Sequence, residues 1–478
     1  MGAMRIPSPL RIAILIFLLS LVLRIAWAAC AHITPIIDSR EYDTLAVRWL
    51  STGNFGTEGR LAYRSPGYPG FLAAVYAVFG HSWKAVAIIQ AFLSAMTSGL
   101  LVLLAAHVLS PRGSAIAGLL HALSPPAIAY VPILASENLA LPLLIVGLLC
   151  LAIADSHAAP RTYAAMAGSG AALGLLLLVR PAAVFFLPAW LLLAAYSPRK
   201  RVWRLRPPLI LLCMTMLLLA PWLARNYLVG LGPLTLSTTG GMNAWMGNND
   251  ATERGRFCGP ALAALSLGDL SERERDAVYG AAALAWIRDH PRRYLALCRT
   301  RAIRLLGAVP DPWARRYLAP TRENDSAILA ASRRGKGGTE ASPPTPSPNL
   351  AARWRAARER NTVFLGFLRS LVAPLTLLAL ILSFRRWRTY AIVVLPALCY
   401  LGAVSLVYAV TRFRQLSDPL LFVPLAGLLS DLLFGSAELG TRPSRGLKLG
   451  AAVLVVIASV VLHATGLAMT WYQLTPIR

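Results

Sequence analysis

Ionisable residues stand at the ends of several apolar runs in this sequence, where few charges are expected. The stretch DSREYDTLAVRW (38–49) follows the first apolar run, and its Glu41, Leu45 and Trp49 have helical spacing. Asp38 should therefore lie near the positive N-terminal end of a short juxtamembrane helix. The other charged residues that we group with it are Arg40, Arg64, Glu137, Arg180, Arg412 and Arg414.

This set of residue types can bind a phosphate group and remove a proton from a nearby hydroxyl. Guanidinium groups bind phosphate through charge-assisted hydrogen bonds, and a positioned carboxylate acts as a general base. Charges at membrane depth are costly unless they face a polar cavity or one another, which makes them functional candidates. Taken singly, each acid could be a helix cap and each arginine a snorkelling residue. Their position on one side of the membrane favours a shared site.

The composition indicates which elements must position these residues. Of the 478 residues, 56% are hydrophobic and 14% are charged, whereas soluble domains carry about 25% charged residues. Apolar stretches of about 20 residues, the length that crosses the hydrocarbon layer, recur along the chain. The sequence therefore predicts an all-α polytopic membrane protein whose first apolar run is a retained helix. The expected spans, about eleven, are 10–31, 83–109, 113–131, 136–155, 163–179, 181–197, 207–226, 362–384, 389–410, 416–434 and 449–471.

Basic residues set the expected orientation. The segments SPRKRVWRLR (197–206), FRRWR (384–388) and TRPSRGLK (441–448) fall on one side when spans are counted, and the positive-inside rule makes that side cytoplasmic. The N-terminus is then cytoplasmic and the charged candidates are exoplasmic. The net charge of +26 fits attraction to lipid and topology control, or binding of an anionic substrate. Nucleic acid is disfavoured, because the basic residues are dispersed among the spans.

Three regions are expected along the chain. They are an N-terminal transmembrane module (1–226) with a first exoplasmic loop (32–82), an exoplasmic cap (227–361), and the C-terminal transmembrane helices (362–478).

Two parts of these regions are too polar or too short for spans. The segment PGYPGFLAAVYAVFG (66–80) is broken by Pro and Gly, so it should be interfacial or re-entrant. In the cap, 271–307 is predicted to form two amphipathic helices interrupted at Pro291. The Gly-, Ser- and Pro-rich segment 331–349 is expected to be disordered.

Cysteines and histidines show no metal-binding spacing. Cys258 and Cys298 lie in one extramembrane segment and could form a disulfide in an oxidising compartment. We interpret His121 and His290 as structural or interfacial residues. Two exoplasmic carboxylates could hold a divalent cation, although nearby arginines would already neutralise a phosphate, so metal dependence stays open.

Three further charged residues, Arg24, Asp43 and Asp418, are interpreted one by one. Arg24 lies about two turns from the exoplasmic end of the first span, and either snorkels outward or pairs with Asp38 or Glu137. Helical geometry turns Asp43 away from the side of Asp38. Asp418, beside a proline, is interpreted as a turn former.

Taken in order, the polar motifs resemble a known family. They are Asp38 with Tyr42, then YRSPGYP, SENL, LVRPAA, APWLARN, GGMNAWMGNN, IRDHPRRY and a late RFR. This order is similar to that of the GT-C fold glycosyltransferases that use polyprenyl-phosphate sugars, of the bacterial protein O-mannosyltransferase and aminoarabinose transferase type. The resemblance covers nearly the whole chain, while each motif alone is short and degenerate.

The Ala- and Arg-rich composition favours a bacterial inner membrane with the active side in the periplasm, and the resemblance implies an enzyme that acts on the exoplasmic side. It would pass a sugar from a polyprenyl phosphate to a hydroxyl of a lipid, glycan or protein, with inversion at the anomeric carbon. It implies that Asp38 is the general base, with Glu41 as an alternative, and that Glu137 is the second acid. The residues it implies at the donor phosphate or the leaving group are Arg40, Arg64, Arg180, Arg412 and Arg414.

Two departures from the family pattern favour its broad branch over lipid A modification. Aminoarabinose transferases tend to show Asp-Glu and Lys-Pro-Pro, where this sequence has Asp38-Ser39 and Arg64-Ser65-Pro66. Weaker candidates for sugar or acceptor binding are Tyr42, Tyr63, Tyr68, Asn243 and Asn248. The asparagines belong to GGMNAWMGNND (240–250), which is either a structural turn or a sugar-binding loop.

Two other function classes remain. A flippase or transporter of lipid-linked sugars would place ionisable residues near the bilayer midplane and along both halves of a pathway. A polysaccharide ligase or polymerase would share the arginines and the compartment. The one-sided clustering of charges favours the transferase.

Overall fold

A computed structural model describes most of the chain. The described residues are 8–31, 35, 38–157, 160–197, 202–252, 265, 267–306, 375–407, 413–435 and 438. They are almost entirely helical, with one two-stranded antiparallel sheet of β1 (Tyr196–Ser197) and β2 (Val202–Trp203).

Seven described helices are long and apolar enough to cross a membrane. They are α1 (Pro9–Cys30), α4 (Trp83–Ala105), α7 (Glu137–Ser156), α8 (Arg161–Val179), α10 (Arg206–Leu228), α17 (Trp387–Val407) and α18 (Arg414–Phe434). The expectation of an all-α multi-pass membrane protein is therefore confirmed. The predicted span 449–471, the disordered segment 331–349 and most of 362–384 lie outside the described residues, so the count of eleven spans stays a prediction.

Two predicted spans are wrong as single helices, because prolines divide them. The segment 113–131 forms α5 (Pro111–Ala122) and α6 (Pro125–Ala129), since Pro125 and Pro126 begin a new helix. The segment 181–197 forms a 3₁₀ helix, η1 (Pro181–Phe186), followed by α9 (Leu187–Ala195) and then strand β1. A further short 3₁₀ helix, η3 (Phe384–Arg386), leads into α17.

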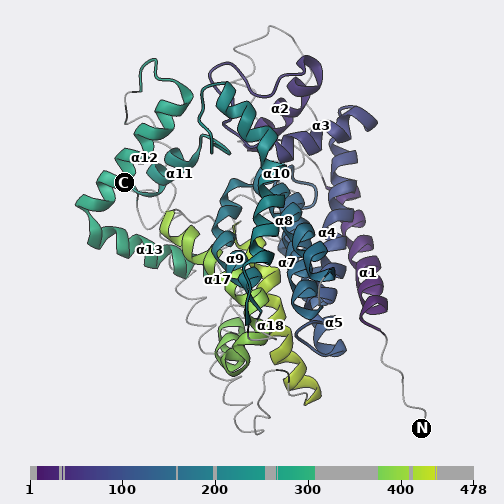
Figure 1. Cartoon of the computed structure of the whole chain (residues 1–478). Coiled ribbons are helices and arrows are strands. Elements are labelled where there is room, and N and C mark those ends of the chain that lie inside the picture. Colours follow the sequence, from purple (N-terminus) through teal and green to yellow (C-terminus); the bar gives the residue numbers. More distant parts are fainter. Residues whose placement is uncertain are drawn as a thin grey trace, which may run out of the picture.

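The remaining helices are shorter or more polar than the spans. They are α2 (Asp38–Thr52), α3 (Gly67–Phe79), α11 (Gly240–Gly247), α12 (Glu272–Asp289) and α13 (Pro291–Leu306). Within 66–80 the chain forms the 13-residue α3, which is shorter than a span, and α12 and α13 confirm two helices parted at Pro291. In Figure 1, α11, α12 and α13 lie together on one flank, on the far side of the bundle from α1.

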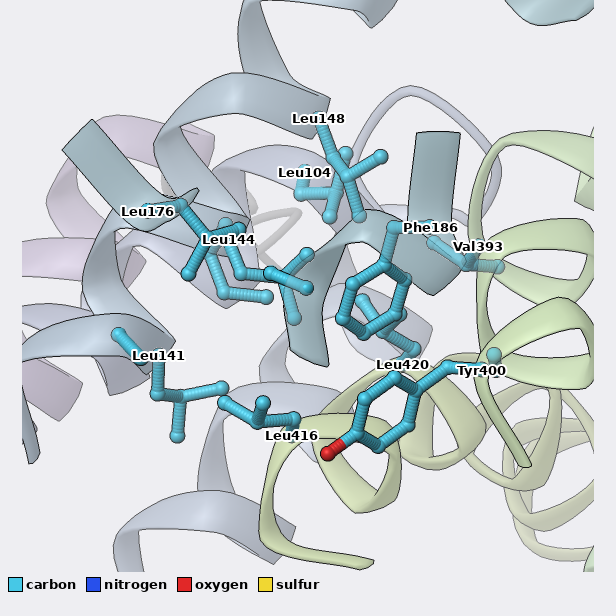
Figure 2. Packing of buried hydrophobic residues seen from close by; sticks show 14 of the residues in the cluster. Leu104, Leu141, Leu144, Leu148, Leu176, Phe186, Val393, Tyr400, Leu416 and Leu420 are labelled. Carbon is cyan, nitrogen blue, oxygen red and sulfur yellow. The ribbon is translucent and has the colours of Figure 1, made fainter. Parts of the chain in front are cut away.

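A dense core joins the N-terminal and C-terminal helices. Figure 2 shows leucines of α4, α7 and α8 packed against Phe186 of η1. The same leucines meet the C-terminal helices at Val393 and Tyr400 of α17 and at Leu416 and Leu420 of α18. Phe186 and Tyr400 stack with centroids 4.5 Å apart and planes 3° from parallel. Because lipid is as apolar as these side chains, close packing rather than hydrophobic transfer holds such helices together.

Small residues let α8 approach α10 closely. A Cβ on Gly170 would lie 2.3 Å from the Leu211 carbonyl oxygen, so only glycine fits there. Gly174 is similarly close to Thr215, whose carbonyl oxygen would lie 3.1 Å from an added Cβ. The contact fixes the axis of α8, and with it the position of Arg180 at its C-terminal end.

Candidate functional site

Arg64 joins two carboxylates of α2. Asp38 and Glu41 lie in the first turn of that helix, and the loop before α3 brings Arg64 against them. Arg64 Nε donates to Glu41 Oε2 at 2.8 Å, while its Nη2 lies 2.7 Å from Asp38 Oδ1 and 2.6 Å from Glu41 Oε2. Within the part of the chain that the structure describes, Arg64 Nη1 makes no hydrogen bond. One edge of the guanidinium therefore holds both acids, and its other end can donate elsewhere.

Two tyrosines flank this guanidinium. The Arg64 Cζ lies 5.4 Å from the centroid of the Tyr42 ring and 5.1 Å from that of Tyr63. Tyr42 packs edge-on against Tyr68, with centroids 4.9 Å apart. Tyr68 is fully buried and donates its hydroxyl to Gln90 Oε1 at 2.7 Å. Tyr42 and Tyr63 thus border the charged cluster, and Tyr68 packs against the Tyr42 ring.

The cluster keeps Arg64 charged. Burial of the guanidinium favours its neutral form, but the neighbouring Tyr42, Asp38 and Glu41 outweigh burial, so the pKa of Arg64 is raised above its usual value. Burial raises the pKa of the Tyr63 phenol as well, with Glu41 adding to the shift and Arg64 opposing it. At neutral pH the site therefore holds a fixed cation and a protonated phenol.

Asp43 faces the opposite side of α2, as predicted. Its Oδ1 accepts hydrogen bonds from the Tyr76 hydroxyl at 2.6 Å and from Trp83 Nε1 at 3.0 Å, and lies 2.9 Å from His81 Nε2. These contacts tie α2 to α3 and to the start of α4. They also separate Asp43 from the Arg64 cluster.

Glu137 and Arg180 form a second charged pair. Glu137 begins α7 and Arg180 follows the last residue of α8, and Arg180 Nη1 lies 2.9 Å from Glu137 Oε1. Their side chains are only 4% and 10% exposed. Arg180 Nη1 also donates to Ser136 Oγ at 3.1 Å, and its Cζ lies 4.9 Å from the Phe413 ring centroid. The pair is therefore shielded from solvent by α18.

Arg414 adds a third basic group beside this pair. It begins α18, is 5% exposed, and donates from Nε to Asp418 Oδ1 at 2.8 Å. The interpretation of Asp418 as a turn former is wrong, because this acid lies inside α18 and pairs with Arg414. Asp418 and Glu137 line the same pocket, between α4, α5, α6, α7 and α18, with His121, Tyr130 and Gln415.

Two hydrogen bonds connect the charged groups. Ser65, next to Arg64, donates its hydroxyl to the Val179 carbonyl at 3.2 Å, immediately before Arg180. Ser39, next to Asp38, donates its hydroxyl to the Leu134 carbonyl at 2.8 Å, three residues before Glu137. The structure thus places the two candidate sets side by side, on the ends of α2, α7 and α8.

The remaining predicted residues are placed differently. Arg40 lies on the exposed face of α2, and Arg412 lies outside the described residues. Asn243 is half-buried on α11. Asn248 is 1% exposed, donates to the carbonyls of Ala244 and Val407, and accepts from Arg301 Nη2 at 3.1 Å. The Asn248 amide therefore ties α11 to α17 and α13.

Arg24 follows neither predicted course. It is fully buried, and its guanidinium donates to the hydroxyls of Ser94 and Ser20 at 2.8 and 2.6 Å. It also donates to the carbonyls of His121 and Ala122 at 3.0 and 2.9 Å. Both carbonyls lie at the end of α5, whose negative dipole end favours a cation. Arg24 is thus held between α1, α4 and α5.

No group of three His, Cys, Asp or Glu side chains suited to a metal ion occurs among the described residues. Asp38 and Glu41 share Arg64 instead. Cys298 is a free thiol, and its predicted partner Cys258 lies outside the described residues.

Sequence reasoning missed two residues that hold the loop before Arg64. Glu272 of α12 accepts hydrogen bonds from the backbone of Leu61 and Ala62, and Arg225 of α10 donates to the Leu61 carbonyl at 2.9 Å. Arg225 belongs to the motif APWLARN, which was a usable signal. Glu272 gave none, because its capping position explains an acid there without any distant partner.

Part of this chain is similar to a described protein family. Residues 63–224 match the family model described as dolichyl-phosphate-mannose-protein mannosyltransferase, a segment that runs from Tyr63 into the last turn of α10. None of the curated proteins compared with the chain matches it significantly.

Several solved structures resemble the chain over most of its length. The Archaeoglobus fulgidus oligosaccharyltransferase in complex with Zn and sulfate is 13% identical, with a TM-score of 0.50 over 95% of this chain and 52% of that chain. The apo form of the same enzyme gives a TM-score of 0.49 at 14% identity, over 96% and 56% of the two chains. ArnT from Cupriavidus metallidurans bound to undecaprenyl phosphate gives a TM-score of 0.38 at 14% identity, over 87% and 78%. The chain spans little more than half the length of the archaeal structures that it matches. Its helices are therefore arranged in the GT-C fold of membrane glycosyltransferases.

Proposed function

We propose that this chain is an inverting glycosyltransferase that moves a sugar from a polyprenyl-phosphate donor to an acceptor hydroxyl on the exoplasmic face of a bacterial inner membrane. The observation that carries the proposal is the sharing of Arg64 between Asp38 and Glu41 at 2.7 and 2.6 Å. Such a reaction needs a carboxylate and a phosphate-binding cation in one site, on the two sides of the anomeric carbon, because proton removal and departure of the phosphate accompany one displacement. The family match at 63–224 supports a lipid-phosphate-linked sugar as donor.

Asp38 is the general base of the proposed reaction. Asp38 accepts the proton of the acceptor hydroxyl, whose oxygen forms a bond to the anomeric carbon. The bond from that carbon to the phosphate oxygen breaks, and its electron pair leaves with the polyprenyl phosphate. A positioned base of this kind contributes about 10²–10⁴-fold in rate. Because one displacement occurs, the configuration at the anomeric carbon inverts.

The arginines receive the departing phosphate. Arg64 turns Nε and Nη2 toward the acids, so its Nη1 end is suited to donate to a phosphate oxygen. Arg180 and Arg414, buried beside Glu137 and Asp418, add positive charge nearby. Preorganised donors in a site of low dielectric stabilise developing charge better than water does, and loss of one costs about 3–4 kcal/mol.

The test is release of polyprenyl phosphate by the purified protein in nanodiscs. Undecaprenyl phosphates carrying different sugars are supplied with candidate acceptors, and free undecaprenyl phosphate is followed by mass spectrometry. We expect acceptor-dependent release by the wild type and its loss in Asp38→Asn. Asp43→Asn is the matched control on the same helix, since its amide oxygen still accepts from Tyr76 and Trp83.

Either outcome is informative. Release that falls about 10²-fold or more in Asp38→Asn and persists in Asp43→Asn supports the transferase with Asp38 as its base. Binding of every lipid-linked sugar without release, unaffected by Asp38→Asn, contradicts the catalytic proposal and brings a transporter forward.

A further inference from the structure

Leu61 and Ala62, the two residues before Tyr63, are hydrogen-bonded through both of their backbone amides and both of their carbonyls. The amide of Leu61 donates to Glu272 Oε2 at 2.5 Å, and its carbonyl accepts from Arg225 Nη1 at 2.9 Å. The amide of Ala62 donates to Glu272 Oε1 at 3.2 Å, and its carbonyl accepts from the Thr238 amide at 3.0 Å. Ala62 is fully buried. These four bonds fix the chain directly ahead of Arg64.

Glu272 makes more of these contacts than any other described side chain. Its carboxylate, at the first residue of α12, accepts from both amides and from the Thr238 hydroxyl. It therefore connects α12, the segment before α11 and the loop before α3, three elements separated along the sequence. A capping acid would need none of these distant partners.

The next turn of α12 extends the same arrangement. Asp276 Oδ1 accepts from the amides of Gly241 and Met242 at 2.7 and 3.1 Å, at the start of α11. The Tyr63 hydroxyl in turn lies 3.8 Å from Met242 Sδ. One face of α12 thus holds both the loop that carries Arg64 and the helix that borders Tyr63.

The turns of this loop are made by glycines. It contains glycines at positive φ, Gly53, Gly56 and Gly59, with φ of 70°, 98° and 68°. Glycine permits many backbone conformations, so these residues supply turns without rigidity. Removing the Glu272 carboxylate would leave two backbone amides near the site without acceptors, which costs more than one ordinary hydrogen bond.

We propose that Glu272 is a positioning residue that acts through the backbone of Leu61 and Ala62 to set the position of Arg64 against Asp38 and Glu41. The effect of Glu272 on donor binding rests on the function proposed above. Its effect on the loop before Arg64 is independent of that function. The exoplasmic helix α12 thereby becomes part of the donor site without touching the donor.

The loop is tested first, by hydrogen–deuterium exchange of the full-length protein in nanodiscs. In wild type, the amides in a peptide covering residues 60–66 should exchange slowly. Glu272→Ala should speed the exchange of the Leu61 and Ala62 amides at least about tenfold, since these two lose their acceptor. Glu272→Gln, which keeps one carbonyl oxygen, should give an intermediate rate.

Two control variants separate this effect from damage to α12. Glu274→Ala removes the capping box at Ser271 but touches neither Leu61 nor Ala62. Asp289→Asn removes one negative charge from the exposed end of the same helix. Both should leave exchange at 60–66 unchanged. Equal exchange in wild type and Glu272→Ala, or equal acceleration in Glu274→Ala, overturns the proposal.

The link to Arg64 is tested by titrating undecaprenyl phosphate into wild type, Glu272→Ala, Arg64→Ala and the double variant, with binding read by native mass spectrometry. Glu272→Ala should weaken binding about tenfold, as loss of one or two positioning bonds implies. In the Arg64→Ala background it should add nothing, because the group it positions is gone. Fully additive effects overturn the positioning role. Wild-type protein that binds no undecaprenyl phosphate, but shows faster exchange only in the Glu272 variants, refutes the proposed function while supporting the role of Glu272 in the loop.

Discussion

The Ser65 hydroxyl donates to the Val179 carbonyl at 3.2 Å. Because Arg64 precedes Ser65 and Arg180 follows Val179, this bond holds two arginines from distant parts of the sequence beside each other. Gly67 brings the same segments closer still, since an added Cβ there would lie 2.7 Å from the carbonyl carbon of Leu178. The loop that carries Arg64 is therefore packed against the end of α8, and the charged site has a rigid base.

Lysine should not replace Arg64 in phosphate binding. Arg64→Lys keeps the charge but cannot bond Asp38 and Glu41 through two nitrogens while donating to a phosphate. We expect Arg64→Ala to weaken undecaprenyl-phosphate binding by about 3 kcal/mol and Arg64→Lys to recover only part of the loss. Isothermal titration in nanodiscs measures both. Full recovery by lysine would contradict a role for the guanidinium fork.

The affinity for the donor phosphate should not fall at alkaline pH, because Arg64 stays protonated. The pKa of Arg64 is raised, so its ion-pair stabilisation is fully present below the ordinary arginine pKa and is lost only as pH rises through the higher folded value. We expect constant undecaprenyl-phosphate affinity between about pH 7 and 10 in wild type. Arg64→Lys provides the contrast above about pH 10, since lysine titrates at about pH 10.4 and should introduce a decline there that the wild type does not show. The same decline in wild type would assign phosphate binding to another group.

Glu137 and Arg180 should depend on each other for stability. Replacing one partner of a buried ion pair leaves an uncompensated charge and costs about 3–5 kcal/mol. We expect Glu137→Gln and Arg180→Gln each to lower the unfolding temperature markedly, and the double variant to recover most of that loss. Tryptophan fluorescence during heating in detergent measures the three shifts. Additive losses in the double variant would show that the pair is not coupled.

Gly241 should tolerate no side chain. A Cβ there would lie 1.9 Å from the Asp276 carbonyl oxygen and 2.7 Å from the Gly280 amide nitrogen, both in the backbone of α12. Gly241→Ala should therefore destabilise the protein by about 1–3 kcal/mol and separate α11 from α12. Gly240→Ala is the matched control, since its Cβ would meet nothing closer than Asp276 Oδ2 at 3.9 Å. Thermal unfolding of the two variants decides the matter, and equal stability would contradict this packing.

Local signals were sufficient to predict much of this fold. Long apolar runs predicted the seven described spans, and Pro291, which interrupts the helical pattern, predicted the break between α12 and α13. The position of Asp38 near the start of α2 and the turn of Asp43 away from it follow from the helical pattern alone. Prolines were weighed too lightly at 125 and 188, where they divide predicted spans.

Pairings between distant residues could not be predicted in the same way. Nothing near Asp418 indicates that it lines a pocket shared with Glu137, because that depends on how α18 packs against α7. Its pair with Arg414, by contrast, is a local contact four residues apart in one helix. Likewise, Glu272 is a normal helix-starting acid by sequence, and only the fold brings it to Leu61. Residue type identified the cations and acids, while tertiary packing decided which of them meet.

The partners of Arg24 bear on the order in which this chain enters the membrane. A lone arginine at the centre of a helix costs about 2.5–3.5 kcal/mol to insert. Its compensating groups, Ser94 on α4 and the carbonyls of His121 and Ala122 on α5, are synthesised some seventy to a hundred residues later. The first helix therefore reaches its stable position only after α4 and α5 have emerged.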